Sequence, residues 1–356
     1  MSSRSRLVAL ALTAGLVVAA CSSGGSGSAP PSSAAASVPP SAIASDLPTT
    51  APSVEPTPLV VGLGYIPNVQ FAPFYLADQE GYYAEAGLDV EFQNKIDPDL
   101  ITLVGQGSVD IGLADGTSVI PAVGQGIPIK YVATIYGQFP SIVFSKTSSG
   151  IAAPADLAGK RLGIPGRYGS SWIMLQALLA SADLTPDDLE IVEYPDFGQG
   201  AAVIAGAVDA ATGFVNNEPV QLELTGEPAT VLHVDDVVPL PGNGLIVGTA
   251  TIESKRAAIE AFIAATLRAM QTIQADPQAG IDASVAAVPE LATAPETQRA
   301  VLDATIEVWT GPYQTEHGLG AISVDDWDEA IRFMASIGML PQPILAGPAI
   351  DDSMLP

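Results

Sequence analysis

The sequence predicts an α/β protein whose folded part has two lobes. Short apolar runs typical of strands alternate with helical stretches from Leu59 to Ile337. Hydrophobic residues make up 48% of the 356-residue chain, which is enough for a large core. Single cores stop growing at about 250–300 residues, so this length allows one or two domains. The order of the elements fits two lobes better than one continuous sheet.

The first lobe begins with an apolar strand over 59–65, which Pro67 ends. A helix is expected over 72–86 and a half-exposed strand over 88–92. The next expected elements are a helix at 99–105, a strand at 109–113, a helix at 117–124 and a strand at 129–135. Strands that alternate with helices at this spacing predict parallel βαβ units.

A second set of elements begins at Ile142. Its expected strands are 142–144, 162–164, 189–194, 210–214 and 230–234, with a helix over 171–181, a returning strand at 245–247 and helices at 253–274, 281–288, 296–309 and 324–337. The expected domains are therefore lobe 1 over 59–138, lobe 2 over 139–249, C-terminal helices of lobe 1 over 250–340 and a tail over 341–356. Hinges are expected near 136–140 and 243–247.

The first residues read as an export signal followed by a tether. Arg4 and Arg6 precede an apolar run that ends at Ala20, too short to span a bilayer but typical of a signal peptide over 1–20. Cys21, the chain's one cysteine, follows at a site that resembles a bacterial lipobox and is expected to carry the lipid. The rest of 21–58 is rich in Ser, Gly, Ala and Pro, as flexible tethers are. We therefore expect a lipid-anchored protein on the extracytoplasmic face of the cell membrane.

Composition and motifs exclude several other classes. A formal charge of −26 disfavours nucleic acid as a partner. One cysteine excludes a disulfide framework, and two isolated histidines, His233 and His317, do not make an imidazole metal site. Neither a nucleophile elbow nor a Walker loop occurs in the sequence. We therefore expect no metal, no cofactor and no enzyme activity.

Recognition chemistry is expected where strands end, because ligands of open α/β sheets bind beyond the carboxyl ends of the strands. Nine of the chain's 21 aromatic residues fall in these loops, interleaved with polar side chains that suit a planar, hydrogen-bonding ligand. The candidate binding residues are Tyr65, Asn68, Phe71, Phe74, Asp115, Thr117, Tyr136, Phe139, Arg167, Tyr168, Ser170, Ser171, Trp172, Phe197, Phe214, Asn216 and Glu218. The alternative is that the rings merely fill loop-to-helix junctions. Arg167 either holds an anionic group or is a solvated loop residue.

Four segments together resemble one group of solute-binding proteins of ABC importers, which take thiamine pyrimidine precursors, alkanesulfonates, nitrate or riboflavin. These segments are 65–77, 81–90, 105–112 and 156–161, and the resemblance covers about 59–337. It implies a two-lobed periplasmic-binding-protein type 2 clamshell with two crossover strands. It also implies an ABC permease and its ATPase subunit as partners, and a receptor that acts as a monomer.

Within this group the aromatic-Pro-Asn stretch at 65–68 resembles the pyrimidine and riboflavin branches most. A related eukaryotic enzyme that forms the thiamine pyrimidine carries a histidine at the position of Phe71 and needs a cysteine cluster, and this chain has neither. We therefore expect a receptor for a small heteroaromatic ligand, riboflavin or the thiamine pyrimidine. The alternatives are an oxyanion receptor for alkanesulfonate or nitrate and, third, a pyrimidine-synthesising enzyme on the same fold.

Overall fold

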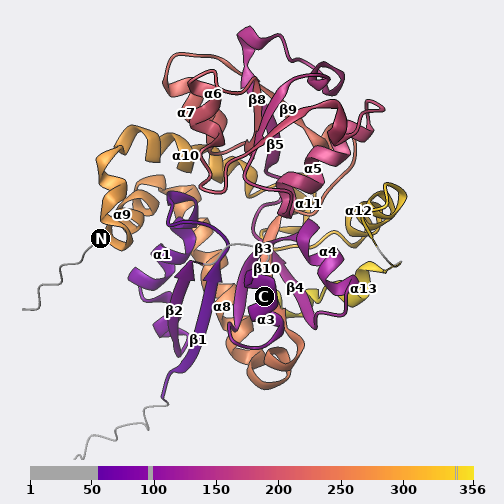
Figure 1. Cartoon of the computed structure of the whole chain (residues 1–356). Helices are drawn as coiled ribbons and strands as arrows, with labels where there is room; N and C mark the ends of the chain where they lie inside the picture. The colour runs from indigo at the N-terminus through magenta and orange to yellow at the C-terminus, as the bar shows by residue number, and fades with distance from the viewer. Residues whose placement is uncertain (1–54, 95–98, 341, 343) are drawn as a thin grey trace, which may run out of the picture. The chain divides into compact units, whose positions relative to one another are not determined.

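Two five-stranded sheets organise the chain (Figure 1). The computed structural model describes residues 55–94, 99–340, 342 and 344–356, which belong to one unit, Ser53–Pro356. The first sheet has the order β2-β1-β3-β10-β4 and the second β7-β6-β8-β5-β9. The strands are β1 (Thr57–Leu63), β2 (Leu88–Asn94), β3 (Ile111–Asp115), β4 (Ile129–Thr134), β5 (Ser141–Lys146), β6 (Arg161–Ile164), β7 (Glu190–Glu193), β8 (Ala210–Phe214), β9 (Ala229–His233) and β10 (Asn243–Gly248).

Helices cover both sheets. With the first sheet go α1 (Ala72–Gln79), α2 (Tyr82–Glu85), α3 (Asp99–Gly105), α4 (Gly116–Gly124), α8 (Thr249–Ala275), α9 (Pro277–Ala287), α10 (Pro295–Val308), α11 (Pro312–His317), α12 (Val324–Ser336) and α13 (Ala346–Ala349). With the second sheet go α5 (Gly169–Ala180), α6 (Gln199–Ile204) and α7 (Glu218–Leu224). We call the first sheet with its helices lobe 1 and the second sheet with its helices lobe 2.

One strand in each sheet runs against its neighbours. β10 is antiparallel to β3 and β4, and β5 is antiparallel to β8 and β9, whereas the pairs of β1 and β6 are parallel. Each of the two is the first strand after the chain crosses from the other sheet, so it enters from the opposite end. The expectation of purely parallel units is wrong for these two strands, because a run of apolar residues does not encode the direction of a strand.

The two crossings are short segments, 135–140 and 234–242. The first contains residues 136–140, where the sequence predicts a hinge. The sequence places the second at 243–247, but those residues form β10, held between β3 and β4. Lobe 2 therefore ends before Asn243, earlier than the expected boundary at residue 249, and β1 begins at Thr57, inside the segment expected to be tether.

The inner strands β3 and β10 of the first sheet are buried on both faces, to which their successive side chains point in turn. In β10, Leu245 and Val247 lie in the apolar cluster with α1 and α8, whereas Ile246 lies in the cluster on the other face. In the second sheet, Val143 of β5 likewise points away from Phe144. Strands covered on both faces read as continuous apolar runs, which is why the sequence predicts their positions well.

The helices differ from expectation where the backbone changes direction. The helix expected over 72–86 is divided into α1 and α2 at Gly81, whose φ of 72° is accessible mainly to glycine. α8 contains one non-helical residue, Lys255, whose ammonium group donates to Asp110 at 2.9 Å and to the carbonyl of Pro58 at 3.0 Å. The short helices α6, α7 and α11 give no period long enough to predict.

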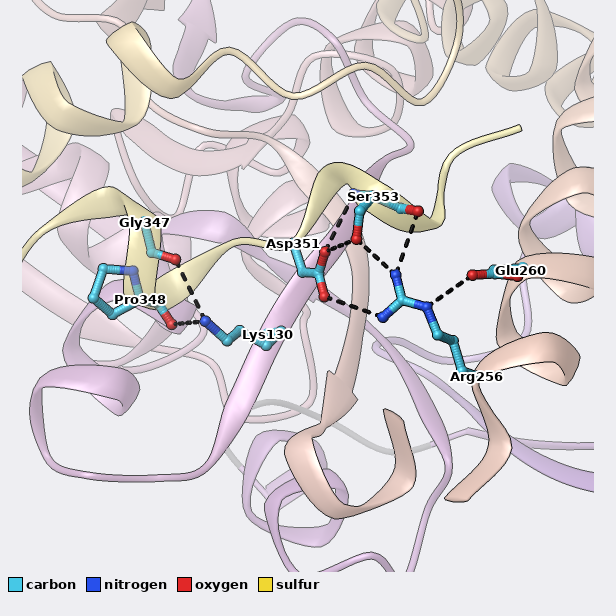
Figure 2. A network of polar contacts seen from close by, with 7 residues as sticks. All are labelled: Lys130, Arg256, Glu260, Gly347, Pro348, Asp351 and Ser353. Carbon is cyan, nitrogen blue, oxygen red and sulfur yellow. Dashed lines mark hydrogen bonds and ion pairs between the residues drawn. The ribbon is translucent and has the colours of Figure 1, made fainter. Parts of the chain in front are cut away.

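The C-terminal residues, placed in a tail by the sequence analysis, pack on lobe 1 (Figure 2). Ile350 pairs with Tyr131 of β4, and the N–H of Asp351 donates to the Tyr131 carbonyl at 2.9 Å. Arg256 of α8 donates to the Ser353 hydroxyl at 2.6 Å and lies 3.8 Å from the Asp351 carboxylate. Lys130 donates to the carbonyl of Pro348 at 2.6 Å. Ala346, Ala349 and Met354 are buried as a result.

The predictions on the N-terminal region concern residues outside the described part of the chain. The signal peptide, the lipidated Cys21 and the tether up to residue 54 all lie there. Across the described ranges, none of the helices combines the length and the apolar character that a membrane crossing requires.

Candidate ligand-binding site

A hollow of about 860 Å³, counting the part open to solvent, lies where strands of both lobes end. Ten predicted residues line it, namely Tyr65, Phe71, Asp115, Tyr136, Tyr168, Ser170, Ser171, Phe197, Phe214 and Glu218. The carboxyl ends of β1, β3, β6 and β8 and the start of β10 meet there, as expected for an open α/β sheet.

An aromatic contact crosses the hollow from lobe to lobe. The ring of Tyr65, which follows β1, meets the ring of Phe197 edge to face, with centroids 5.1 Å apart and planes at 90°. Such pairs contribute about 0.5–1.5 kcal/mol beyond the area that they bury. Phe197 has a φ of 60°, in the left-handed region, which costs a residue with a side chain about 1 kcal/mol or more. The structure therefore holds this ring in place against a backbone preference.

Asp115 lies at the end of β3 and is only 8% exposed. Burial raises the pKa of its carboxyl, while the hydroxyl and the backbone N–H of Ser170 and the side chain of Asn243 lower it. Ser170 belongs to lobe 2, so this carboxyl interacts across the hollow. The Ser141 hydroxyl donates to the Ser170 oxygen at 3.2 Å, which leaves the Ser170 proton free to point toward Asp115.

Glu218 is the second acidic residue of the hollow and opens α7. Its Oε2 accepts from the backbone N–H of Phe214 at 2.8 Å. Burial raises the pKa of its carboxyl, which the Phe214 N–H and the Asn217 side chain partly offset. Glu218 fits because β8 carries Gly213, where a Cβ would lie 2.8 Å from Oε2. Burial and the nearby Glu218 also raise the pKa of Tyr65.

A buried polar network joins the lobes at one side of the hollow. The Tyr136 hydroxyl donates to Gln70 at 3.2 Å, and the Asn216 amide donates to Tyr136 at 3.4 Å and to Thr305 of α10 at 2.8 Å. Asn216 comes from lobe 2, whereas Gln70 and Thr305 come from lobe 1. Burial raises the pKa of Tyr136, so its hydroxyl stays protonated and can donate.

Several acceptor oxygens in the hollow have no hydrogen-bond partner. The buried oxygens Asp115 Oδ1, Gln199 Oε1 and Asn243 Oδ1 are unpartnered, and all three residues line the hollow. Buried acceptors normally find a donor, because an unsatisfied one costs about 1–3 kcal/mol. The hollow is therefore prepared for a ligand that brings N–H or O–H donors.

Positive charge is missing from the lining. No Lys, Arg or His occurs among the described residues that line the hollow. Arg167, the candidate anion-holding residue, lies outside the lining, pairs with Glu193 at 3.2 Å and stacks over Trp172 at 5.2 Å. Across the described part of the chain, no group of three or more His, Cys, Asp or Glu could hold a metal ion.

Seven predicted residues lie outside the lining, namely Asn68, Phe74, Thr117, Phe139, Arg167, Trp172 and Asn216. Phe74 is 1% exposed and stacks on Phe262 in the core of lobe 1, and Phe139 is buried in the other cluster. Asn68 instead accepts from the Gln70 N–H at 3.0 Å and so caps a turn.

The other predicted residues outside the lining lie in elements next to the hollow. Thr117 is buried in the first turn of α4. Trp172 is half-buried on α5 and packs against an apolar cluster with residues from both lobes. Asn216 is completely buried and supports Tyr136 instead. The residue type predicts ligand contacts for these three positions, but their side chains pack or bond within the protein instead.

Four polar residues of the lining are missing from the predicted set: Gln70, Gln199, Asn217 and Asn243. Gln70 and Asn217 lie in the very loops that the sequence singles out. Gln199 opens the unpredicted helix α6, and Asn243 begins the antiparallel strand β10 opposite Asp115. Asn243 could have been predicted only by recognising that β10 is the strand that returns from the other sheet.

Solved structures of the same fold are known from proteins of low sequence identity. The alkanesulfonate-binding protein SsuA from Xanthomonas axonopodis pv. citri, bound to MOPS, is similar with a TM-score of 0.66 and 19% identity over 84% of this chain and 100% of that chain. The Candida albicans CA3427 gene product, described as having the generic periplasmic binding protein fold, has a TM-score of 0.61 and 15% identity over 83% and 96%. The fold is therefore that of the periplasmic binding proteins.

Sequence relatives name the family. The chain matches the NMT1/THI5-like family over residues 68–280 and belongs to it. It is 34% identical over 312 residues to the riboflavin-binding protein RibY of Chloroflexus aurantiacus, 86% of this chain and 89% of that protein. The predicted α/β fold class and the predicted family resemblance are confirmed.

Two further relatives differ in what their names say, since one is named a binding protein and the other an enzyme. The formylaminopyrimidine-binding protein of Halalkalibacterium halodurans is 27% identical over 80% of this chain and 87% of its own. The 4-amino-5-hydroxymethyl-2-methylpyrimidine phosphate synthase of Legionella pneumophila is 27% identical over 79% and 86%.

Proposed function

We propose that this protein is the extracytoplasmic solute-binding protein of an ABC importer, which takes up a small heteroaromatic vitamin or vitamin precursor between its lobes. The observation that carries the proposal is the lining of the hollow. Aromatic rings of both lobes, among them Tyr65 and Phe197, face a space that also holds three unpartnered acceptor oxygens. A planar ring with N–H or O–H groups satisfies both features at once.

Riboflavin and the thiamine pyrimidine are the two ligands we consider, and riboflavin is the first choice. The 34% identical relative is named a riboflavin-binding protein, and a more distant one a formylaminopyrimidine-binding protein. The isoalloxazine ring has the larger stacking surface, and the ribityl chain carries hydroxyls that can donate to Asp115, Gln199 and Asn243. Two or three ring contacts with satisfied hydrogen bonds suffice for about −8 kcal/mol, a micromolar affinity.

An oxyanion ligand fits this lining poorly. Sulfonate and nitrate bring acceptors and negative charge, whereas the hollow offers two carboxyls, unpartnered acceptors and no cation among its described lining residues. The site also gives little support to a synthase activity. Phe71 lines the hollow at the position where the related eukaryotic enzyme that forms the thiamine pyrimidine carries a histidine. We therefore propose binding without catalysis.

We further propose that a signal peptide is removed and that Cys21 is lipidated, which places the protein on the outer face of the cell membrane. A permease with its ATPase subunit would receive the ligand from the monomeric receptor. Lobe closure would bend the two crossings, 135–140 and 234–242, since these segments join the sheets. A ligand favours the closed form only through its contacts with both lobes.

Titration of the purified full-length protein tests the ligand class. Riboflavin, 4-amino-5-hydroxymethyl-2-methylpyrimidine, an alkanesulfonate and nitrate are each followed by isothermal calorimetry, with flavin fluorescence as a second signal for riboflavin. We expect micromolar or tighter binding of one ring compound and none of the oxyanions. Binding of the oxyanions alone would overturn the proposal. Membrane fractionation of cells that express the Cys21→Ser variant tests the anchor, and unchanged membrane association would contradict it.

A further inference from the structure

The start of α5 is a helix N-terminus that faces the hollow without a cap from its own sequence. Gly169, Ser170 and Ser171 line the hollow, and Gly169 has a φ of 64°, which lets the chain turn into the helix. The preceding residue provides no capping side chain, and the first turn of α5 has no acidic residue. The first N–H groups of a helix are unpaired and carry partial positive charge, so this end attracts an anion.

The anion at this helix end is supplied by the other lobe. Asp115 of β3 lines the same hollow as Ser170, which is 3% exposed, and the backbone N–H and hydroxyl of Ser170 lower the pKa of the Asp115 carboxyl. Ser141 of β5 donates to the Ser170 hydroxyl oxygen at 3.2 Å, so the Ser170 proton is not used in that bond. A side chain of lobe 1 thus occupies the position at which a bound oxyanion would find its best donors.

Asp115 still has one acceptor oxygen without a hydrogen-bond partner. Its Oδ1 is buried and unpartnered, and Asn243, its register partner on β10, and Gln199 each add one more unpartnered oxygen. No described lining residue carries a positive charge that could balance a second anion, and Glu218 adds a further carboxyl. A phosphate carries −1.5 to −2 charges near neutral pH and only acceptor oxygens once ionised, so the two carboxyls repel it and the unpartnered acceptors cannot pair with it.

We infer that Asp115 is a specificity-determining residue, a resident carboxylate at the start of α5 that keeps anionic ligands out and reserves the site for an uncharged ring compound with hydrogen-bond donors. The inference rests on the proposed function. It predicts that the receptor takes the free vitamin or precursor and rejects its phosphate ester. The reaction that adds the phosphate then has to follow uptake.

Paired titrations of the full-length protein with riboflavin and riboflavin 5′-phosphate, and with the aminopyrimidine and its phosphate, test the inference. We expect the wild type to bind one free compound at least a hundredfold more tightly than its phosphate. Asp115→Asn should reduce that ratio at least tenfold, and Asp115→Glu should keep it closer to the wild-type value. MOPS, a sulfonate without a large ring, should not bind the wild type.

Glu218→Gln is the matched control, because it removes the other buried carboxyl of the same hollow without touching α5. A smaller change of the ratio in Glu218→Gln than in Asp115→Asn supports the inference, and an equal change overturns it. Thermal melts show that each variant is folded. Equal wild-type affinity for a free compound and its phosphate overturns the inference but leaves the proposed function standing. Tight wild-type binding of MOPS also overturns it, and binding of no ring compound overturns both.

Discussion

The two sheets share one strand order but end differently at the hollow. In the first sheet the crossing strand β10 starts with Asn243, whose register partner is Asp115. In the second sheet the crossing strand β5 starts with Ser141, whose register partner is Phe214. At these equivalent register positions the same backbone plan therefore places two acceptor side chains in lobe 1 and a hydroxyl and a ring in lobe 2. Because equivalent positions carry different side chains in the two lobes, the lobes can contact each other and still leave acceptor oxygens for a ligand.

Asn216→Ala breaks the polar link between the two lobes, and we expect it to have the largest effect on stability. The variant loses the amide that donates to Thr305 at 2.8 Å and to Tyr136 at 3.4 Å. Loss of a partner in a buried network costs about 1–3 kcal/mol, which urea denaturation measures.

Thr305→Val provides the control for this link. If both substitutions act through the same hydrogen bond, the double variant should lose less free energy of unfolding than the sum of the single ones. Simple additivity would show that the lobes are not coupled through Asn216.

Tyr65→Ala removes the ring that lobe 1 contributes to the aromatic contact. We expect at least a tenfold loss of affinity for the ring ligand, about 1.4 kcal/mol, because Phe197 then lacks the ring that it meets across the hollow. Calorimetric titration measures it. Trp172→Ala is the matched control, since Trp172 lies on α5 outside the lining and its loss should leave the affinity unchanged. Equal losses would move the ligand to the outer face of α5.

Asp115→Asn sharpens the comparison through the pH dependence of stability. Burial raises the pKa of Asp115 in the folded state, so ionisation of this group costs folding free energy above the pKa of the unfolded chain, near 3.9. The variant should therefore melt at a higher temperature than the wild type at pH 7. The difference should shrink as the pH falls toward 4, because the wild-type carboxyl then becomes increasingly protonated in the unfolded chain as well. A gap that stays constant from pH 7 to pH 4 would contradict this assignment.

Arg256→Ala leaves the lining of the hollow unchanged in both lobes, and we expect it to have the smallest effect on stability. Arg256 is 42% exposed, so its contacts with Glu260, Asp351 and Ser353 are worth less than about 1 kcal/mol. Chemical denaturation should show a small loss, and the affinity for ligand should not change. A large change in affinity would mean that the C-terminal segment influences the site.

The sequence predicts the strands well and the site in part, for physical reasons. Apolar runs mark β1, β3 and β8 because sheets buried on both faces need them, and the rule that ligands bind at strand ends locates Tyr65, Asp115 and Phe214.

What the sequence does not reveal depends on distant parts of the chain. Phe74 and Tyr65 are both aromatic residues after the same strand, yet Phe74 faces Phe262 of α8, nearly two hundred positions away. Asn243 reaches the site because β10 returns antiparallel, and nothing local in the chain encodes that return.

The last residues of the chain have a consequence for solubility. β4 is the outermost strand of the first sheet, and Ile350 and Asp351 pair with its Tyr131. An outer strand without such cover offers free N–H and C=O groups to another molecule. The C-terminal segment thus covers part of this edge beside the bridge of Gly320 to Thr134. A chain cut off before Ala346 should therefore aggregate more than the full chain, which size-exclusion chromatography measures.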